Sequence, residues 1–205
     1  MKRVTGIVLV LLCFLGKAQE ESKNPLYYIN GGISIGNLSG GQIGINLAVE
    51  NRFSAQLEYS GVVRKAKATP EDYTGGLVSI FAFGTNRPVD NIHSFRILAG
   101  KISTIHSSGN TRINLKAGLS FLTYREANNF EKDQLGGLLL VPNYSWETRK
   151  IQQIGVVFKP ELEHVFVNFA GYTISPYLEI TSDISTVGIA FYLLMGKVWN
   201  IGQVQ

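Results

Sequence analysis

The chain has 205 residues, with 17% charged side chains, 22 glycines and a formal net charge of +4. Its single cysteine, Cys13, and three of its 19 Lys and Arg residues lie within the first 18 positions, which leaves 16 basic against 15 acidic residues in the remainder. This near balance excludes a nucleic-acid-binding surface that depends on net positive charge. Without cysteines, residues 19–205 cannot form a disulfide-stapled scaffold.

The first residues have the pattern of an export signal. Lys2 and Arg3 precede an apolar run over residues 7–15, and residues 16–18 (Gly-Lys-Ala) have the small-x-small form of a cleavage site. The run is too short to span a bilayer as a helix. These features predict a secretory signal peptide over residues 1–18, cleaved after Ala18 or Gln19, and one domain over residues 19–205.

Nine short segments along the chain alternate apolar and polar residues with a period of two, the spacing of a β-strand. Turn residues separate neighbouring segments, as Asn51-Arg52 does in the manner of a hairpin. No segment has the periodicity of a long amphipathic helix, so the expected fold class is all-β. In chain order the segments are Leu26–Gly36, Gln42–Glu50, Phe53–Val63, Leu77–Gly84, Ser94–Thr104, Arg112–Tyr124, Ile154–His164, Tyr172–Ser182 and Thr186–Val198.

The number of segments bears on the architecture, because a bacterial single-chain outer-membrane barrel has an even number of strands. If Leu77–Gly84 belongs to a long excursion over residues 63–92, eight strands remain. We therefore expect a closed antiparallel up-and-down transmembrane β-barrel of eight strands; ten strands, with a further strand in the excursion, are the alternative. With eight, the connections alternate between two ends, 37–40, 63–92, 125–150 and 183–185 at one and 51–52, 105–110 and 165–171 at the other, and the two longest fall at the same end.

The two faces of these strands distinguish a membrane barrel from a soluble one. A lipocalin-like secreted barrel that binds a small apolar ligand has an apolar interior, whereas an outer-membrane barrel turns apolar residues to lipid. The polar faces here are rich in Gly, Ser, Thr and Asn, and Lys and Glu are scarcer than on a fully wetted exterior. We therefore predict a lumen in which charges of both signs compensate one another and leave no open pore. The predicted network comprises Glu50, Glu58, Arg96, Arg112, Lys116, Lys159, Glu161, Glu163 and Glu179.

Two features of the last strands concern strand pairing and assembly. Pro160 and Pro176 fall inside strands, where proline lacks a ladder donor, and by parity both face outward, so we expect bulges or early strand ends there. The final strand carries a polar-x-Gly-x-x-hydrophobic-x-hydrophobic spacing that resembles the signal recognised by barrel assembly machinery. It departs from that signal because the chain continues to Gln205. The residues of this assembly signal are Thr186, Gly188, Phe191 and Leu193.

The leader ending in Lys17-Ala18-Gln19, the Gly-spaced strands and the C-terminal strands from Ile154 through Gly196-Lys197 resemble the small outer-membrane β-barrel proteins of the Bacteroidota. Those proteins are similar to the eight-stranded barrels of other Gram-negative bacteria. The resemblance implies a location in the outer membrane, contact with its lipid and lipopolysaccharide, and handling by the barrel assembly machinery. Many members of such families have no assigned activity, so the resemblance implies fold and location more than function.

Candidate sites for chemistry are few. His93, His106 and His164 lack carboxylate or Cys partners at ligand spacing, so we expect no metal site. His106-Ser107-Ser108 resembles the His and Ser pair of outer-membrane lipid A deacylases, but it lies in a Gly-Asn turn whose residues suit turn chemistry. Glu161 and Glu163 share a strand face and are assigned to the lumen rather than to a catalytic pair. We expect no enzyme and no cofactor, with a lipid A esterase as the minor alternative.

The distinguishing surface of such a barrel is expected in its loops, because loops on a rigid scaffold usually carry recognition. The segment Arg125–Arg149 mixes charged residues with apolar ones, a composition suited to contact with an unknown extracellular partner. The alternative is that Leu138–Val141 and Tyr144–Trp146 extend the strand that begins near Ile154, or pair with an extension of the preceding strand beyond the membrane.

Overall fold

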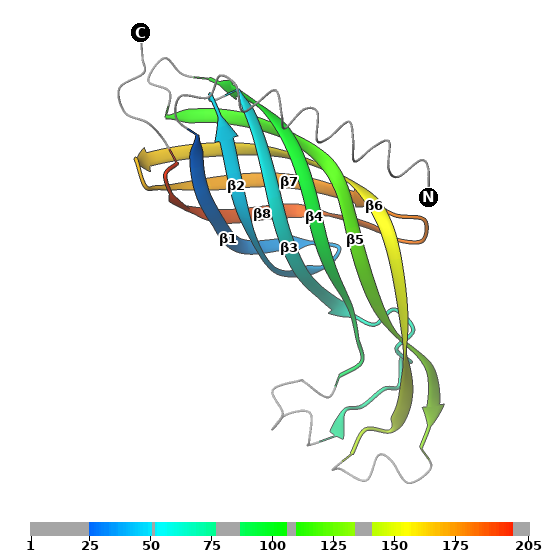
Figure 1. Ribbon diagram of the computed structural model, residues 1–205. Helices are drawn as coiled ribbons and strands as arrows, with labels where there is room; N and C mark the ends of the chain where they lie inside the picture. Colours follow the sequence, from blue (N-terminus) through cyan, green and yellow to red (C-terminus); the bar gives the residue numbers. More distant parts are fainter. Residues whose placement is uncertain (1–24, 51, 77–86, 106–109, 134–140, 199–205) are drawn as a thin grey trace, which may run out of the picture.

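The computed structural model describes residues 25–50, 52–76, 87–105, 110–133 and 141–198. These residues form a closed barrel of eight antiparallel strands in chain order, with β1 pairing β8 to complete the ring (Figure 1). The expectation of an eight-stranded up-and-down barrel is therefore confirmed. The strands are β1 (Leu26–Gly36), β2 (Ser39–Val49), β3 (Phe53–Lys65), β4 (Val89–Thr104), β5 (Thr111–Lys132), β6 (Tyr144–Val167), β7 (Ala170–Ile180) and β8 (Ser185–Gly196).

The period-two alternation of the sequence becomes an alternation of burial. In β7, Thr173, Ser175 and Glu179 point into the barrel and are buried, while Ile174 and Leu178 between them are exposed on the outside. The other strands follow the same rule over the barrel wall. The arrangement contradicts the lipocalin-like alternative, because that fold places its apolar residues inside. Within the described residues, no helix combines the length and the hydropathy that a membrane crossing requires.

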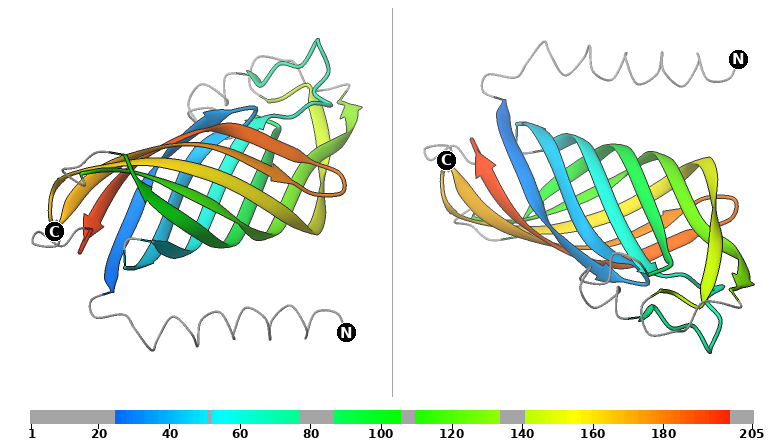
Figure 2. Two further views of the ribbon diagram at one scale, coloured as in Figure 1. Left: turned by 90° about the horizontal axis from the view of Figure 1, so that it is seen from above. Right: turned by 90° about the horizontal axis from the view of Figure 1, so that it is seen from below.

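The two ends of the barrel differ in how far the chain extends from it. We call the loop end the one that carries the connections β1–β2, β3–β4, β5–β6 and β7–β8, and the turn end the one that carries β2–β3, β4–β5 and β6–β7. Figure 2 shows that the long β5–β6 hairpin projects from the loop end, alongside part of the β3–β4 connection. The prediction that the two longest connections fall at the same end agrees with this arrangement.

The hairpin of β5 and β6 is longer than the sequence pattern indicated. Pairing of β4 with β5 ends at Asn91–Arg125, but pairing of β5 with β6 continues to Lys132–Tyr144. We call the extension, residues 126–132 of β5 with residues 144–150 of β6, the ribbon; a register shift between Asn128 and Glu131 interrupts it. The expected loop over residues 125–149 is thus largely strand, and the alternative that Tyr144–Trp146 pairs with an extended β5 is confirmed. The ribbon is exposed to water on both faces, so neither face needs apolar residues. Its charged residues at successive positions therefore show no period-two alternation, and the sequence pattern did not indicate strands there.

Other differences from the expected boundaries are small. The β1–β2 turn is tighter than the expected residues 37–40, because Gly40 already pairs with Val62 in the β2–β3 ladder. A Cβ atom on Gly40 would lie 2.1 Å from the carbonyl oxygen of Gly61, so the ladder requires glycine at this position. The expected signal peptide and the segment Leu77–Gly84 lie outside the described residues.

The two prolines behave differently from the expectation. Both face outward, but neither ends its strand or forces a bulge, since β6 and β7 keep one register from Phe158–Leu178 to Leu162–Ile174. That register places Pro160 directly opposite Pro176. The ladder is interrupted around this point, over residues 159–161, where the Ser175 hydroxyl donates to the carbonyl oxygen of Pro160 at 2.9 Å. The two missing ladder donors thus lie at the same place, and the Ser175 side chain partly compensates for them. This explains why no bulge is needed.

An apolar cluster closes each end of the lumen. The loop-end cluster has Ile151 and Ile184 packed against it, and the turn-end cluster includes Tyr28 and Val198. The polar interior therefore lies between two apolar layers. The loop-end cluster is Leu38, Val62, Ile92, Leu122 and Tyr124; the turn-end cluster is Leu26, Tyr28, Ala48, Ile102, Val165, Leu194 and Val198.

Candidate functional site

Eight charged side chains meet inside the barrel between the two apolar clusters. All are buried, with relative exposures of 3% or less. Four are cationic and four are anionic, so the interior is formally neutral. We call them the lumen network: Arg96 from β4, Arg112 and Lys116 from β5, Lys159, Glu161 and Glu163 from β6, Glu58 from β3 and Glu179 from β7.

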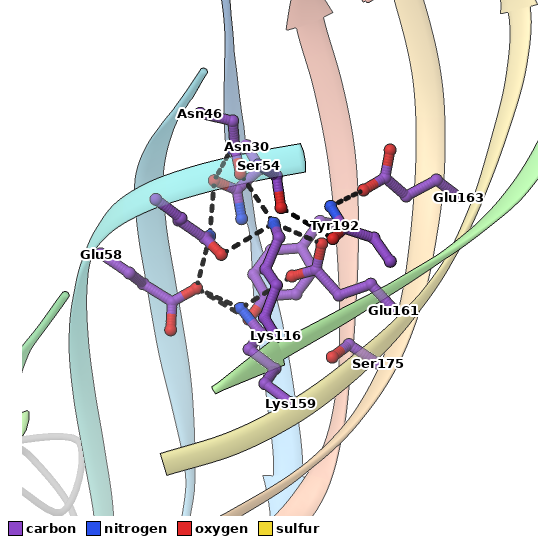
Figure 3. A network of polar contacts seen from close by, with 12 residues as sticks. Asn30, Asn46, Ser54, Glu58, Lys116, Lys159, Glu161, Glu163, Ser175 and Tyr192 are labelled. Carbon is purple, nitrogen blue, oxygen red and sulfur yellow. Dashed lines mark hydrogen bonds and ion pairs between the residues drawn. The ribbon is translucent and has the colours of Figure 1, made fainter. Parts of the chain in front are cut away.

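Arg96 and Lys159 both pair with Glu58, and this shared carboxylate joins the two halves of the network. The Arg96 guanidinium donates to Glu58 at 2.8 Å and to Glu179 at 2.6 Å, and thereby bridges β3 and β7 across the lumen. Lys159 pairs with Glu58 and, at 3.2 Å, with Glu161. Figure 3 shows Glu58 and Lys159 pointing toward each other from opposite strands.

Lys116 extends the network with a full set of acceptors. Its Nζ donates to Glu161 at 2.7 Å, to the Asn46 side-chain oxygen at 2.8 Å and to the Gln56 side-chain oxygen at 2.9 Å. Three acceptors match the three donors of an ammonium group, which is the condition for holding such a charge away from water. Six of the eight charges thus form one continuous series, Glu179–Arg96–Glu58–Lys159–Glu161–Lys116.

Arg112 and Glu163 form a separate pair nearer the turn end. Their closest atoms, Arg112 Nη2 and a Glu163 carboxylate oxygen, are 2.5 Å apart. The Asn114 amide donates to the other Glu163 oxygen at 2.9 Å, and Arg112 also donates to the carbonyl oxygen of Val198 at 3.3 Å. This pair therefore ties the residues after β8 to the barrel wall.

Three tyrosines line the lumen beside the cations. The Lys159 Nζ lies 4.4 Å from the ring centroid of Tyr192, and the Arg96 guanidinium carbon lies 5.3 Å from that of Tyr177. Tyr28 takes the same position beside Arg112 at 5.6 Å. Such contacts favour a desolvated cation. Sequence reasoning missed this role, although the positions of these tyrosines on the polar face of their strands were a usable signal.

The prediction that Glu50 belongs to the lumen network is wrong. Glu50 follows the last residue of β2, has a backbone φ of 52° and is exposed. Parity along a strand assigns a face only while the chain stays extended, and the tight β2–β3 turn begins at this residue. The other eight predicted lumen residues all lie inside the barrel.

The four residues of the assembly signal divide between the two faces of β8. Thr186 points inward and donates to Glu179 at 3.2 Å, whereas Phe191 and Leu193 are exposed outside. Gly188 lies against Tyr177, whose hydroxyl oxygen would be 2.9 Å from a Cβ at that position. A glycine here leaves room for the tyrosine ring beside Arg96.

The chemistry available to the lumen network is electrostatic. Its cations and carboxylates bind one another, and an apolar cluster lies between them and each end of the barrel, so the arrangement holds the facing walls of the barrel together. Among the described residues, no three His, Cys, Asp or Glu side chains are grouped to hold a metal ion. His106-Ser107-Ser108 lies outside the described residues; His93 and His164 lie far apart in the chain and contact Tyr59 and Thr111, respectively.

Comparisons with known proteins bear on the fold. No protein-family model matches the chain, and no curated protein matches its sequence. A major outer membrane protein from Thermus thermophilus superposes with a TM-score of 0.58 at 8% identity, over 84% of this chain and 99% of that chain. Neisserial surface protein A superposes with a TM-score of 0.51 at 10% identity, over 87% of this chain and 99% of that one. At these identities the likeness concerns the fold, which is that of small eight-stranded outer-membrane barrels.

Proposed function

We propose that this chain is an integral outer-membrane barrel of a Gram-negative bacterium, closed to conduction, that serves as a rigid scaffold for a surface ribbon. The observation that carries the proposal is the inverted polarity of the barrel. Apolar side chains such as Ile45, Ile154 and Leu193 are 58–66% exposed, while eight charges are buried within. A band of apolar side chains around a closed ring suits lipid, and in water it would be an aggregation surface.

The location is tested by fractionation of a Gram-negative host that expresses the chain. We expect the protein in the outer membrane after removal of residues 1–18, with the heat-dependent gel mobility of a folded barrel. Its recovery in the soluble periplasmic fraction would contradict the proposal. Membership in the Bacteroidota type of barrel is part of the same proposal and is supported by the leader and the C-terminal strands.

The ribbon is the proposed recognition element. Trp146 packs against Phe130 and Tyr73, with ring centroids 6.2 Å apart in both pairs. Asn143 accepts a hydrogen bond from the Thr74 backbone N–H at 2.7 Å, and its own backbone N–H donates to the Thr74 carbonyl at 3.2 Å. The β3–β4 connection therefore buttresses the ribbon near its far end, away from the barrel wall. A buttressed ribbon presents side chains to a partner at a lower entropic cost than a loose loop.

The orientation of the ribbon is tested by an epitope inserted after Asp133. We expect antibody to reach the epitope on intact cells, with normal heat-modifiable folding. Access that requires permeabilised cells would place the ribbon in the periplasm and remove its proposed role.

Lipopolysaccharide and the barrel assembly machinery are the proposed partners in the membrane. Arg125 and Lys150 stand directly opposite each other in the β5–β6 ladder, and both are exposed on the outer face. Like charges in such a pair repel, and a lipid phosphate between them would remove the repulsion. Less lipopolysaccharide should therefore co-purify with an Arg125→Gln, Lys150→Gln variant than with the unmodified protein. The spacing of Thr186, Gly188, Phe191 and Leu193 supports recognition by the assembly machinery.

Catalysis is not part of this proposal. The unmodified protein should release no acyl chains from lipopolysaccharide. Acyl release that His106→Ala and Ser108→Ala each abolish would instead assign the chain to the lipid A esterases.

A further inference from the structure

A hollow of about 360 Å³ opens at the loop end of the barrel, outside the loop-end cluster. Its volume lies within the usual range for small-molecule sites. Four separate parts of the chain contribute to its wall, so closure of the barrel creates it. The lining residues are Arg64, Lys67, Tyr124, Glu126, Arg149, Ile151, Asp183 and Ile184.

The floor of the hollow is apolar and closed. Tyr124 belongs to the loop-end cluster, and Ile151 and Ile184 pack against that cluster. Tyr124 and Ile151 are directly paired in the β5–β6 ladder, so the strand register fixes their relative position. A molecule that enters the hollow meets apolar surface and cannot pass into the lumen network behind it.

Three cationic side chains line the wall of the hollow, and one of them is already bound to neighbouring residues while two are not. Arg64 is already positioned, since its guanidinium donates to Asp90 at 3.0 Å and to the Tyr124 hydroxyl at 3.3 Å. The side chains of Lys67 and Arg149 differ from it: neither makes a hydrogen bond or an ion pair to another residue in the part of the chain that the structure describes. Two cationic groups beside an apolar floor are therefore available to a ligand.

Two acids also line the hollow, so its three cations leave one positive charge in excess. Asp183 accepts a hydrogen bond from the Gln153 side chain. Glu126 stands opposite Arg149 in the β5–β6 ladder and partly offsets its charge. Lys67 forms no ion pair with either acid among the described residues.

We propose that this hollow binds a small organic anion with an apolar body, such as an aryl or short acyl carboxylate. The carboxylate pairs with Lys67 and Arg149, and the apolar body lies on Tyr124, Ile151 and Ile184. Each half of the ligand meets a surface of matching polarity, and the low polarity of the floor strengthens the ion pairs above it. This activity goes beyond the scaffold role and does not depend on which side of the membrane the loop end faces.

Benzoate is the probe, titrated by calorimetry and by NMR into refolded protein in detergent micelles. We expect saturable binding at one site, at least about tenfold tighter than the binding of benzyl alcohol or of inorganic phosphate, because each of these lacks one half of the recognised chemistry. Benzyl alcohol that binds as tightly as benzoate would overturn the role of the cations. Phosphate that binds as tightly would overturn the role of the apolar floor, and a titration without saturation would overturn the site.

Three variants locate the binding. Lys67→Gln with Arg149→Gln should weaken benzoate at least about tenfold. Lys65→Gln with Lys150→Gln is the matched control, because these cations lie on β3 and β6 but face outward; equal weakening by this control would overturn the site. Ile184→Ser should weaken benzoate and leave phosphate unchanged, and an unchanged benzoate affinity would contradict the assignment of the floor. Heat-dependent gel mobility verifies that each variant folds.

Discussion

The lumen and the ribbon use the same kind of ion pair in opposite surroundings. In the lumen, Lys159 and Glu58 pair with no side-chain exposure. Between the ribbon and the β3–β4 connection, Lys132 and Asp72 pair at 2.7 Å with 63% and 55% of their side chains exposed. Water can replace either partner on the ribbon, but no water reaches the lumen pair from the bulk without crossing an apolar cluster. Ion pairs of similar geometry therefore differ in their effect on stability. Removing one partner costs much more free energy when the remaining charge is desolvated than when water can reach it.

The contrast extends to what holds each region together. The lumen is organised by charge, with Glu58 and Glu161 each shared between two cations from different strands. The ribbon is organised by the rings of Tyr73, Phe130 and Trp146, and its ion pair sits at the periphery. Substitutions that affect charge should act strongly in the lumen and weakly on the ribbon.

The largest expected effect is that of Lys159→Leu. It leaves Glu58 and Glu161 with one cation fewer in a closed interior, and should lower the free energy of unfolding by about 3–5 kcal/mol. Glu58→Leu should have an effect of similar size. The measurement is urea unfolding in lipid vesicles, followed by gel mobility and tryptophan fluorescence.

The double variant Glu58→Leu, Lys159→Leu sharpens this test. It restores equal numbers of cations and carboxylates in the lumen, since Arg96 keeps Glu179 and Lys116 keeps Glu161. Its loss of stability should be clearly smaller than the sum of the two single losses. Strictly additive losses would show that the lumen charges act independently, contrary to the network described above.

The next largest effect is expected on the outer face. Ile174 lies at the middle of β7 and is exposed there, so Ile174→Arg should cost about 2–4 kcal/mol in vesicles by placing a charge in hydrocarbon. Leu178→Ala on the same face should be tolerated, because lipid fills the space that the side chain leaves. Fluorescence of a Leu178→Trp variant that lipid-soluble quenchers fail to reduce would contradict the assignment of this face to the bilayer.

A smaller and local effect is expected for Trp146→Ala. It removes two ring contacts, each worth about 0.5–1.5 kcal/mol, and should speed amide hydrogen exchange in the ribbon while the barrel keeps its protection. Thr148→Ala on the same strand is the matched control. A loss of protection in β1 or β8 would mean that the ribbon and the barrel unfold as one unit.

The smallest effect concerns the exposed pair of the ribbon. The hydrogen bond from Lys132, followed by that from Tyr144, holds the pKa of the Asp72 carboxyl below its ordinary value of 3.8. Because the folded-state pKa is lowered, the contact is fully present above pH 3.8 and is lost as the pH falls through the lowered pKa. Lys132→Ala should move the Asp72 pKa upward in an NMR titration and leave the unfolding midpoint of the barrel unchanged. An unmoved pKa would show that Lys132 does not engage Asp72 in solution.

Much of the lumen network was predictable because its cause is local. A residue on the polar face of an extended strand points to the same side as its neighbours two positions away, so Glu58, Arg96 and Lys159 could be placed inside from parity alone. Glu50 shows where this reasoning ends. Parity cannot tell that the chain has already entered a turn.

Partners within the lumen could not be predicted in the same way. Arg96 bridges Glu58, 38 positions away, and Glu179, 83 positions away, and that geometry exists once the ring is closed with its particular stagger. The position of Pro160 opposite Pro176 also depends on the register of the strands in the closed ring. Each proline alone suggests a bulge, and the strand register places both at one point.

The sequence by itself determined the fold class and the face that most side chains within the strands take, because a period of two is a property of the extended chain and requires no partner. The choice between eight and ten strands depended on the closed ring of the tertiary structure. Tertiary structure decided which charges pair, which apolar residues close the two ends and how far β5 and β6 extend as a ribbon. Those features depend on the stagger of the strands and on contacts between distant segments, and an alternating pattern carries no record of either.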